Sequence, residues 1–273
     1  MSTAFHSSRE MGVSGLFELT VFAKDSGPLT KRIWLGPDGT VVSDGSACVM
    51  TSGKARRVML KSLQELADVI DALQSNEAIA LGALRDDLPE EVRVTTKNKL
   101  NGATGMIART QEFLRFRPRL PAFALLDFDA KGMPPEVRAR IDDLGGFWGA
   151  LTAALPALSG IPRVVRRSTS AGLFRIDTCE QMSTSGGIHA YFAVKDGGDI
   201  GRFLTVLHQR CWLAGLGWLA VGGGGQLLER SIVDRMVGAP ERLVFEGAPV
   251  VIPPLAQDLE RRRPAVVTGV GHA

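Results

Sequence analysis

Short apolar segments separated by turn residues make up residues 15–50. The sequence Gly36-Pro37-Asp38-Gly39 between two of these segments is typical of a tight turn, so this region predicts a small antiparallel meander. In the next periodic stretch, Ser62–Leu73, apolar residues recur at helical spacing, and Ser62 and Glu65 have the spacing of a capping box. This second pattern predicts an amphipathic helix with a capped N-terminus.

Further along the chain, strand-like and helix-like patterns alternate. The glycine run Gly222–Gly225 lacks the Gly-Lys-Ser/Thr ending of a phosphate-binding loop, so it predicts a flexible turn. The predicted strands are Glu91–Thr95, Arg163–Arg167 and the second half of Ser183–Val194, and the predicted helices are Met106–Leu114, Glu136–Asp143, Trp148–Leu155 and Asp199–Leu216.

The most informative stretch is Pro121–Lys131. Its apolar run indicates a strand buried on both faces, and Asp127 and Asp129 follow at the C-terminal end. Because side chains alternate along a strand, the two aspartates share one face and Phe128 points away. Two neighbouring carboxylates repel each other unless a cation lies between them, and Mg²⁺ or Mn²⁺ prefers such oxygen ligands. The alternative is a polar turn in which Asp129 bonds local backbone N–H groups.

A histidine near the end of another predicted strand is the second candidate for chemistry. His189 follows Gly186 and Gly187, which would allow the backbone to approach a ligand closely. On this strand His189 and Tyr191 share the face opposite to Ile188. A lone histidine is more often structural, but its position after a glycine turn at a strand end favours a functional role.

Composition and charge narrow the function only slightly. The chain has 45% hydrophobic and 22% charged residues, as ordinary globular proteins do, and a net charge of +3. Its basic residues are clustered, which would suit a phosphate backbone but equally suits solvated faces. The clusters are Lys54–Arg57, Arg115–Arg119, Arg163–Arg167 and Arg261–Arg263.

The cysteines and the apolar runs indicate the compartment. Cys48, Cys179 and Cys211 are widely spaced, which argues against a disulfide framework and fits a reducing cytoplasm. No apolar run reaches the roughly 18 residues that a membrane span needs, and the N-terminus lacks a signal-peptide pattern. His208 and Cys211 could bind zinc together with Cys179, but they lie in an apolar helical pattern without a Cys-x-x-Cys pair, which favours a structural role.

Three short motifs occur in an order that resembles the archaeo-eukaryotic primase superfamily, the primase-polymerases. The flanking sequences, Ser168–Gly172 before the histidine and Ala239–Pro249 after the last aspartate, are similar to those of primase-like proteins from plasmids, phages and integrated elements. The resemblance covers roughly residues 75–255. The motifs are Leu126-Asp127-Phe128-Asp129, Gly187-Ile188-His189 and Val233-Asp234.

The resemblance implies DNA-dependent nucleotidyl transfer by two Mg²⁺ or Mn²⁺ ions, with a nucleoside triphosphate as substrate. Asp127, Asp129 and Asp234 would be the catalytic, metal-binding carboxylates. His189 would contact the triphosphate instead of a metal. Further candidate contacts to the nucleotide are Ser168, Ser170, Arg167 and Arg242, although either arginine could instead form an ordinary surface salt bridge.

The same resemblance implies an α+β fold. A catalytic core over 121–250 should be similar to an RNA-recognition motif, an antiparallel sheet with helices on one face and the site residues on the other, exposed face. An N-terminal α/β unit, 1–120, should pack against it to form a cleft, and 251–273 should be a basic C-terminal tail. Expected partners are single-stranded DNA and a separate replicative helicase, in the bacterial cytoplasm at the nucleoid, with no membrane.

Two other functions stay open at this point. The first is a catalytically silent replication-initiation protein of the same fold that grips single strands or an origin. Its modest charge and 6% aromatic content do not favour it, because base stacking needs aromatic side chains. The second is a metal-dependent phosphoesterase or nuclease, which would use the same carboxylates without a histidine for a triphosphate.

Overall fold

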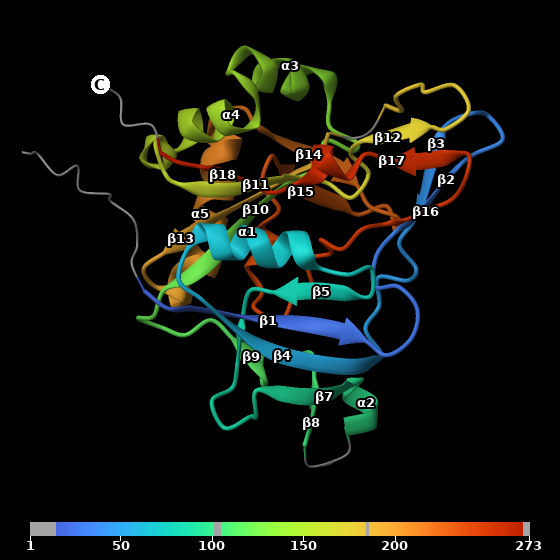
Figure 1. Ribbon diagram of the computed structural model, residues 1–273. Helices are drawn as coiled ribbons and strands as arrows, with labels where there is room; N and C mark the ends of the chain where they lie inside the picture. Colours follow the sequence, from blue (N-terminus) through green and yellow to red (C-terminus); the bar gives the residue numbers. More distant parts are fainter. Residues whose placement is uncertain (1–14, 101–104, 184–185, 270–273) are drawn as a thin grey trace, which may run out of the picture.

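The computed structural model describes residues 15–100, 105–183 and 186–269, which fold into a mixture of helices and several small sheets (Figure 1). This confirms the predicted α+β class at the level of secondary structure. Two sheets carry most of the core. The first is built from the N-terminal part of the chain, and the second begins with the strand that bears Asp127.

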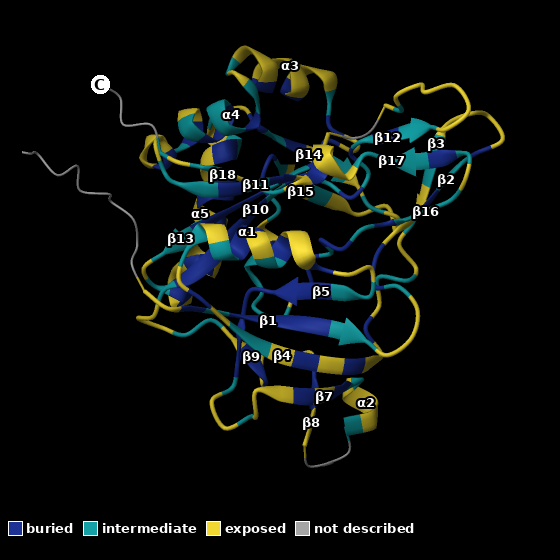
Figure 2. Ribbon diagram, viewed as in Figure 1, coloured by how far each residue is buried: buried dark blue, intermediate teal, exposed yellow. Residues whose placement is uncertain are grey.

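The first sheet has five strands in the order β5-β1-β4-β7-β8. β1 lies between β5 and β4, and its side chains are buried on both faces, whereas β4 alternates between buried and exposed residues (Figure 2). The strands are β5 Glu77–Ala80, β1 Phe17–Lys24, β4 Ser52–Leu60, β7 Glu91–Thr95 and β8 Met106–Ala108.

The predicted meander over residues 15–50 is wrong in one respect. β2 (Arg32–Leu35) and β3 (Val41–Asp44) form the expected hairpin around Gly36–Gly39, but β1 does not pair with β2. β1 is largely buried on both faces, as is typical of a strand that lies between two others. β2 pairs instead with β16 (Val250–Val251), in parallel.

The predicted helix over 106–114 is also wrong. Met106–Ala108 forms β8, parallel to β7, and the chain then turns before β9 (Leu114–Arg115) pairs with β6 (Ala83–Leu84). Ile107 is fully buried in the sheet. Pairing and burial therefore override a weak helical pattern. A short helix, α2 (Lys97–Leu100), precedes this region.

The predicted capped helix is confirmed as α1 (Leu63–Ala72). Ser62 is its N-cap, and its hydroxyl accepts a hydrogen bond of 3.1 Å from the Glu65 backbone N–H. Glu65 Oε2 accepts from the backbone N–H of Lys61, one residue before the cap. α1 lies between the five-stranded sheet and the strands β11 and β18 of the second sheet (Figure 1).

The second sheet is antiparallel, in the order β10-β13-β11-β18. Its fourth strand comes from the segment expected to be a basic tail, 251–273. Residues 265–267 pair with β11 as an edge strand, and Val266 packs against the core, so this part of the chain is folded onto the sheet. The strands are β10 Ala122–Phe128, β13 Ile188–Val194, β11 Arg163–Arg167 and β18 Ala265–Val267.

Helices cover one face of the second sheet. Phe128 stacks on Phe147 of α4, with ring centroids 4.7 Å apart, and Phe192 meets Phe203 of α5 edge to face at 5.7 Å. These contacts bury the face that bears Phe128 and Phe192. The helices are α3 Pro135–Asp143, α4 Gly146–Ala154 and α5 Ile200–Leu213, close to their predicted positions.

The opposite face of this sheet, which bears Asp127 and His189, is not exposed as expected. Phe123 on that face stacks on Phe17 of β1 at 4.3 Å, so the two sheets touch directly there. The 239–249 segment (Ala239–Pro249) continues the cover, because Val244 pairs with Ile79 of β5 through two backbone hydrogen bonds. This face is therefore largely covered by the first sheet and the 239–249 segment.

Smaller elements complete the described fold. The predicted glycine turn joins the hairpin β14 (Gly217–Val221) and β15 (Leu227–Ser231), and no helix of the described residues is long and apolar enough to cross a membrane. The others are β12 Leu173–Arg175, β17 Leu255–Gln257, and the 3₁₀ turns η1 Pro156–Leu158, η2 Gly197–Asp199, η3 Arg235–Gly238 and η4 Leu259–Arg262.

Candidate functional site

The candidate site lies where three strands of the second sheet end together. Asp127 of β10 is directly opposite His189 of β13, and His189 is directly opposite Arg166 of β11. Residues that are opposite each other on antiparallel strands project from the same face. The sheet therefore brings an acid, an imidazole and a guanidinium side by side from positions far apart in the chain.

Asp127 and His189 are in contact and partly accessible to solvent. His189 Nε2 lies 3.4 Å from Asp127 Oδ1, and the two side chains are 16% and 28% exposed. Both side chains therefore keep some surface that solvent can reach.

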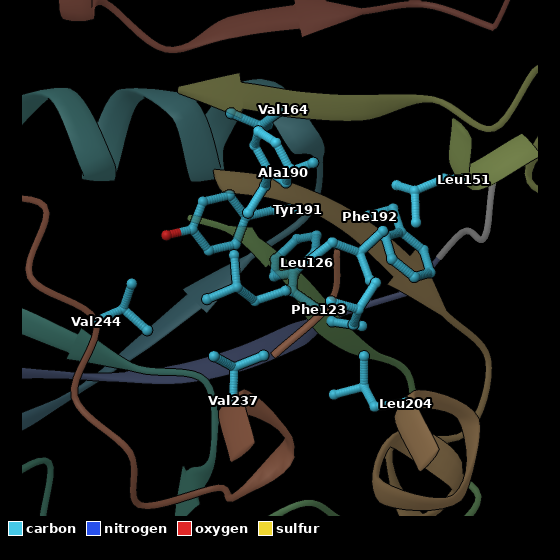
Figure 3. Packing of buried hydrophobic residues seen from close by; sticks show 14 of the residues in the cluster. Phe123, Leu126, Leu151, Val164, Ala190, Tyr191, Phe192, Leu204, Val237 and Val244 are labelled. Carbon is cyan, nitrogen blue, oxygen red and sulfur yellow. The ribbon is translucent and has the colours of Figure 1, made fainter. Parts of the chain in front are cut away.

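Glu246 lies behind His189 and is completely buried. His189 Nδ1 and Glu246 Oε1 are 2.5 Å apart, and the Tyr191 hydroxyl donates to the same oxygen, also at 2.5 Å. A carboxylate can only accept, so Nδ1 carries the proton of this bond. Figure 3 shows the Tyr191 ring among the core residues of the second sheet, with its hydroxyl on the side of Val244.

Two buried arginines face the second oxygen of Glu246. Arg166 Nε and Arg262 Nη2 lie 3.6 and 3.8 Å from Oε2, and both side chains are almost fully buried. Arg166 also donates to the Ile70 carbonyl at the end of α1, and Arg262 donates to the Ser168 and Glu246 carbonyls. Oε2 itself has no hydrogen-bond partner among the described residues.

The buried charges shift one another's ionisation. Burial alone would lower the pKa of His189, but the charge of Glu246 and the hydrogen bonds to Asp127 and Glu246 outweigh it and raise this pKa to about 10. Burial would raise the pKa of Glu246, but the charge and hydrogen bond of His189, followed by Arg166, lower it to about 2. Both groups are therefore charged near neutral pH.

Asp234 reaches the same strand end. Its backbone N–H donates to the Asp127 carbonyl at 3.3 Å, so the predicted motif runs alongside the end of β10. Its carboxylate is engaged locally: Oδ1 accepts from the Met236 N–H at 2.8 Å, and Oδ2 lies 3.4 Å from Arg242. Arg242 thus forms the salt bridge that was its alternative role.

Asp129 follows β10 and is exposed, while Phe128 is buried on the other face as predicted. Its Oδ1 accepts from the Lys131 backbone N–H at 3.0 Å, which is the local turn that was the alternative to metal binding. Among the residues that the structure describes, none forms a hydrogen bond or ion pair with its second oxygen.

The hydroxyl-rich loop after β11 adjoins the histidine motif. The Ser168 N–H donates to the Gly187 carbonyl at 2.9 Å, and the Ser168 and Ser170 hydroxyls are 3.3 Å apart. A Cβ on Gly187 would lie 3.1 Å from Ser168 Cβ and 3.2 Å from the Phe128 carbonyl. Gly187 therefore allows the strand ends to approach each other, not a ligand to approach the backbone.

Arg167 is exposed and takes the wrong side of the sheet for its predicted role. It is opposite Ile188, so its side chain starts from the face that the helices cover, away from His189. The strand alternation places the neighbouring Arg166 on the site face instead.

No three His, Cys, Asp or Glu side chains within residues 15–100, 105–183 and 186–269 are grouped so as to hold a metal ion. His208, a possible zinc ligand, hydrogen-bonds through Nδ1 to the Ser231 hydroxyl at 2.9 Å, and Cys211 is buried. Cys179 is exposed in another region, after β12.

Sequence reasoning missed Glu246, Tyr191, Arg166 and Arg262. Two signals were present. Glu246 is the only charge between Leu243 and Leu255, an otherwise apolar and proline-rich run. Tyr191 is the only tyrosine of the chain and shares a strand face with His189.

No family model matches the chain, and neither the curated proteins nor the solved structures contain a match.

Proposed function

We propose that the protein is a primase-polymerase, a nucleotidyltransferase that starts or extends a strand on single-stranded DNA from nucleoside triphosphates. The observation that carries the proposal is the cross-strand contact of Asp127 with His189, with Asp234 hydrogen-bonded to the backbone of Asp127. Three motifs separated by up to about a hundred residues thereby adjoin one sheet end, as this chemistry requires.

The order of the strands supports the proposal. The three strands follow one another in the chain as β10, β11 and β13, but in the sheet β13 lies between β10 and β11. Helices follow β10 and β13, as they follow the first and third strands of βαββαβ units. The chain at Asp234 lies beside β10, on the side where a fourth strand of such a unit would pair.

Asp127, Asp129 and Asp234 would supply carboxylate oxygens, the ligands that Mg²⁺ and Mn²⁺ prefer. Within the described residues these side chains are not grouped as a metal site, so they would have to converge when the ions bind. When bound, such ions stabilise the attacking 3′-oxygen and the leaving pyrophosphate. His189 would donate from Nε2 to a phosphate oxygen, and the Ser168 and Ser170 hydroxyls lie beside its strand for further contacts. Asp234 would exchange its contact with Arg242 for the cation.

Primer extension on a single-stranded template with Mg²⁺ or Mn²⁺ tests the proposal. We expect synthesis by the natural protein and a loss of roughly 100-fold or more in Asp127→Ala/Asp129→Ala, since charge stabilisation at the reacting phosphate is removed. Asp177→Ala is the matched control, an exposed aspartate paired with Arg175 on β12. Equal synthesis by the double variant and the control would refute the site.

A second function, nucleic-acid binding without catalysis, is favoured by one observation. Asp129 and Asp234 are both satisfied by local partners, Lys131 N–H for one and Met236 N–H with Arg242 for the other. In this case the natural protein would bind single-stranded DNA and synthesise nothing with either ion. Cleavage of the template in the same assay would instead indicate a nuclease.

A further inference from the structure

We propose that Glu246 is the positioning residue of this site: through its bond to Nδ1, it fixes the His189 ring so that Nε2 points to Asp127 and the bound phosphate. The inference rests on the proposed function for what Nε2 would contact. The orientation itself depends only on the contacts around Glu246.

The geometry leaves the ring one orientation. Nδ1 is 2.5 Å from Glu246 Oε1, while Nε2 is 3.4 Å from Asp127 Oδ1. Rotating the ring about its bond to Cβ would break the bond to Glu246. Because a buried carboxylate without its donor is costly, the bond holds the ring.

Glu246 is itself held from three directions, so it can serve as a fixed support. The Tyr191 hydroxyl donates to the same oxygen as His189, and the two arginines face the other oxygen. Arg166 is tied to the last turn of α1 through the Ile70 carbonyl at 2.7 Å. Since α1 has no basic residue in its last turn, this arginine also satisfies the negative end of the helix.

The backbone that carries Glu246 is fixed as well. In the 239–249 segment, Val244 is hydrogen-bonded in both directions to Ile79 of β5, and the Gly247 carbonyl accepts from the Thr30 hydroxyl at 3.3 Å. The first sheet thus positions Glu246, and Glu246 positions a residue of the second sheet. This arrangement explains why a fully buried charge stands in an apolar segment.

Long-range ¹H–¹⁵N spectra of the histidine rings test the orientation without any assay of activity. The His189 signals are identified by their absence in His189→Ala. We expect a slowly exchanging, strongly downfield Nδ1 proton in the natural protein. It should be lost in Glu246→Gln and kept in Glu18→Gln, a control that alters another buried carboxylate, paired with Arg57 and Arg117. An unchanged Nδ1 signal in Glu246→Gln would overturn the proposal.

Nucleotide binding tests the consequence, with a nucleoside triphosphate and Mg²⁺ as the probe. We expect Glu246→Gln to raise Kd and KM by roughly 10- to 100-fold with a smaller change in kcat, as loss of a supporting partner does at other sites. The double variant His189→Ala/Glu246→Gln should bind nucleotide no more weakly than His189→Ala alone, because Glu246 acts through His189. Additive losses would overturn the proposal.

Two variants separate positioning from folding. Tyr191→Phe keeps the charge of Glu246 and the bond to Nδ1, so it should bind nucleotide within about threefold of the natural protein. Glu246→Asp should recover part of the affinity that Glu246→Gln loses; no recovery, in a folded protein, would count against the proposal. If the natural protein binds no nucleotide, the proposed function fails, while the ring spectra still decide the role of Glu246.

Discussion

At the level of single residues, the site is a cluster around one buried acid, Glu246. The groups that face its two oxygens are His189, Tyr191, Arg166 and Arg262. Glu246 alone would be a buried charge, and Arg166 and Arg262 alone would be buried cations. Burial lowers the pKa of Arg262 to about 10, together with the repulsion from Arg166 that Glu246 only partly offsets. Removing one member of such a cluster leaves the others uncompensated, which costs more than the pair contributes.

The first prediction concerns pH. The His189 pKa rises from 6.5 to about 10 on folding, so its stabilisation is complete below pH 6.5 and is lost as the pH rises towards 10. The Glu246 pKa falls from 4.5 to about 2, so its stabilisation is complete above pH 4.5 and is lost towards pH 2. The free energy of unfolding, measured with urea, should therefore be highest between pH 4.5 and pH 6.5 and should fall at lower and at higher pH.

Glu246→Gln should change this profile in two ways. It should lower the free energy of unfolding at pH 6 by roughly 3–5 kcal/mol, because two buried arginines lose their counter-charge. It should also flatten the alkaline slope, because the raised pKa of His189 depends chiefly on Glu246. Glu18→Gln, which alters a buried ion pair away from the histidine, should keep that slope. The same alkaline slope in Glu246→Gln would show that another group causes it.

At the level of elements, the sequence predicts a helix or strand well where local residues determine it, and poorly where pairing with a distant strand determines it. The helix after Ser62 follows from its own cap and periodicity, and the strand before Asp127 from its apolar run. The strand at Met106–Ala108 owes its conformation to β7 and to burial of Ile107, which no local pattern shows. The same dependence on distant pairing explains why only part of the candidate site could be predicted from the sequence.

Asp127 and His189 could be proposed from motifs, and their contact follows from the register of β10 and β13. Glu246 stands out in the sequence as a lone charge in an apolar run, but its role could not be derived there, because it depends on how the 239–249 segment pairs with β5. Arg167 was the predicted nucleotide contact, but its neighbour Arg166 is the one that shares a face with His189, because one residue along a strand changes the face.

A further prediction tests the cap of α1. Ser62→Ala removes the acceptor of the Glu65 N–H and should lower the free energy of unfolding by about 1 kcal/mol. Ser46→Ala is the control, since Ser46 also hydrogen-bonds locally, to Asp44, but in an exposed turn. Thermal or urea unfolding measures both. Equal stabilities of the two variants would mean that tertiary packing alone holds the first turn of α1.

At the level of the whole molecule, the last part of the chain joins the two sheets. The 239–249 segment binds β5, residues 265–267 extend the second sheet, and Arg262 lies between them. Its guanidinium donates to the Ser168 carbonyl of the loop after β11 and to the Glu246 carbonyl, each at 3.1 Å. One side chain thus bonds two backbone segments that neither sheet connects directly.

The last prediction follows from this junction. Arg262→Met keeps much of the volume but removes the donor to the buried Glu246 carbonyl, one of the two donors to the Ser168 carbonyl, and one of the two arginines beside Glu246. Stability should therefore fall by roughly 3–5 kcal/mol. Amide exchange should accelerate together at Ser168, Val244 and Val266, which belong to three separate segments. Arg261→Met, at the exposed neighbour that pairs with Asp258, should change stability by less than about 0.5 kcal/mol. Faster exchange confined to Val266 would show that Arg262 fixes only the strand that follows it, β18, because loss of a junction must loosen every segment it joins.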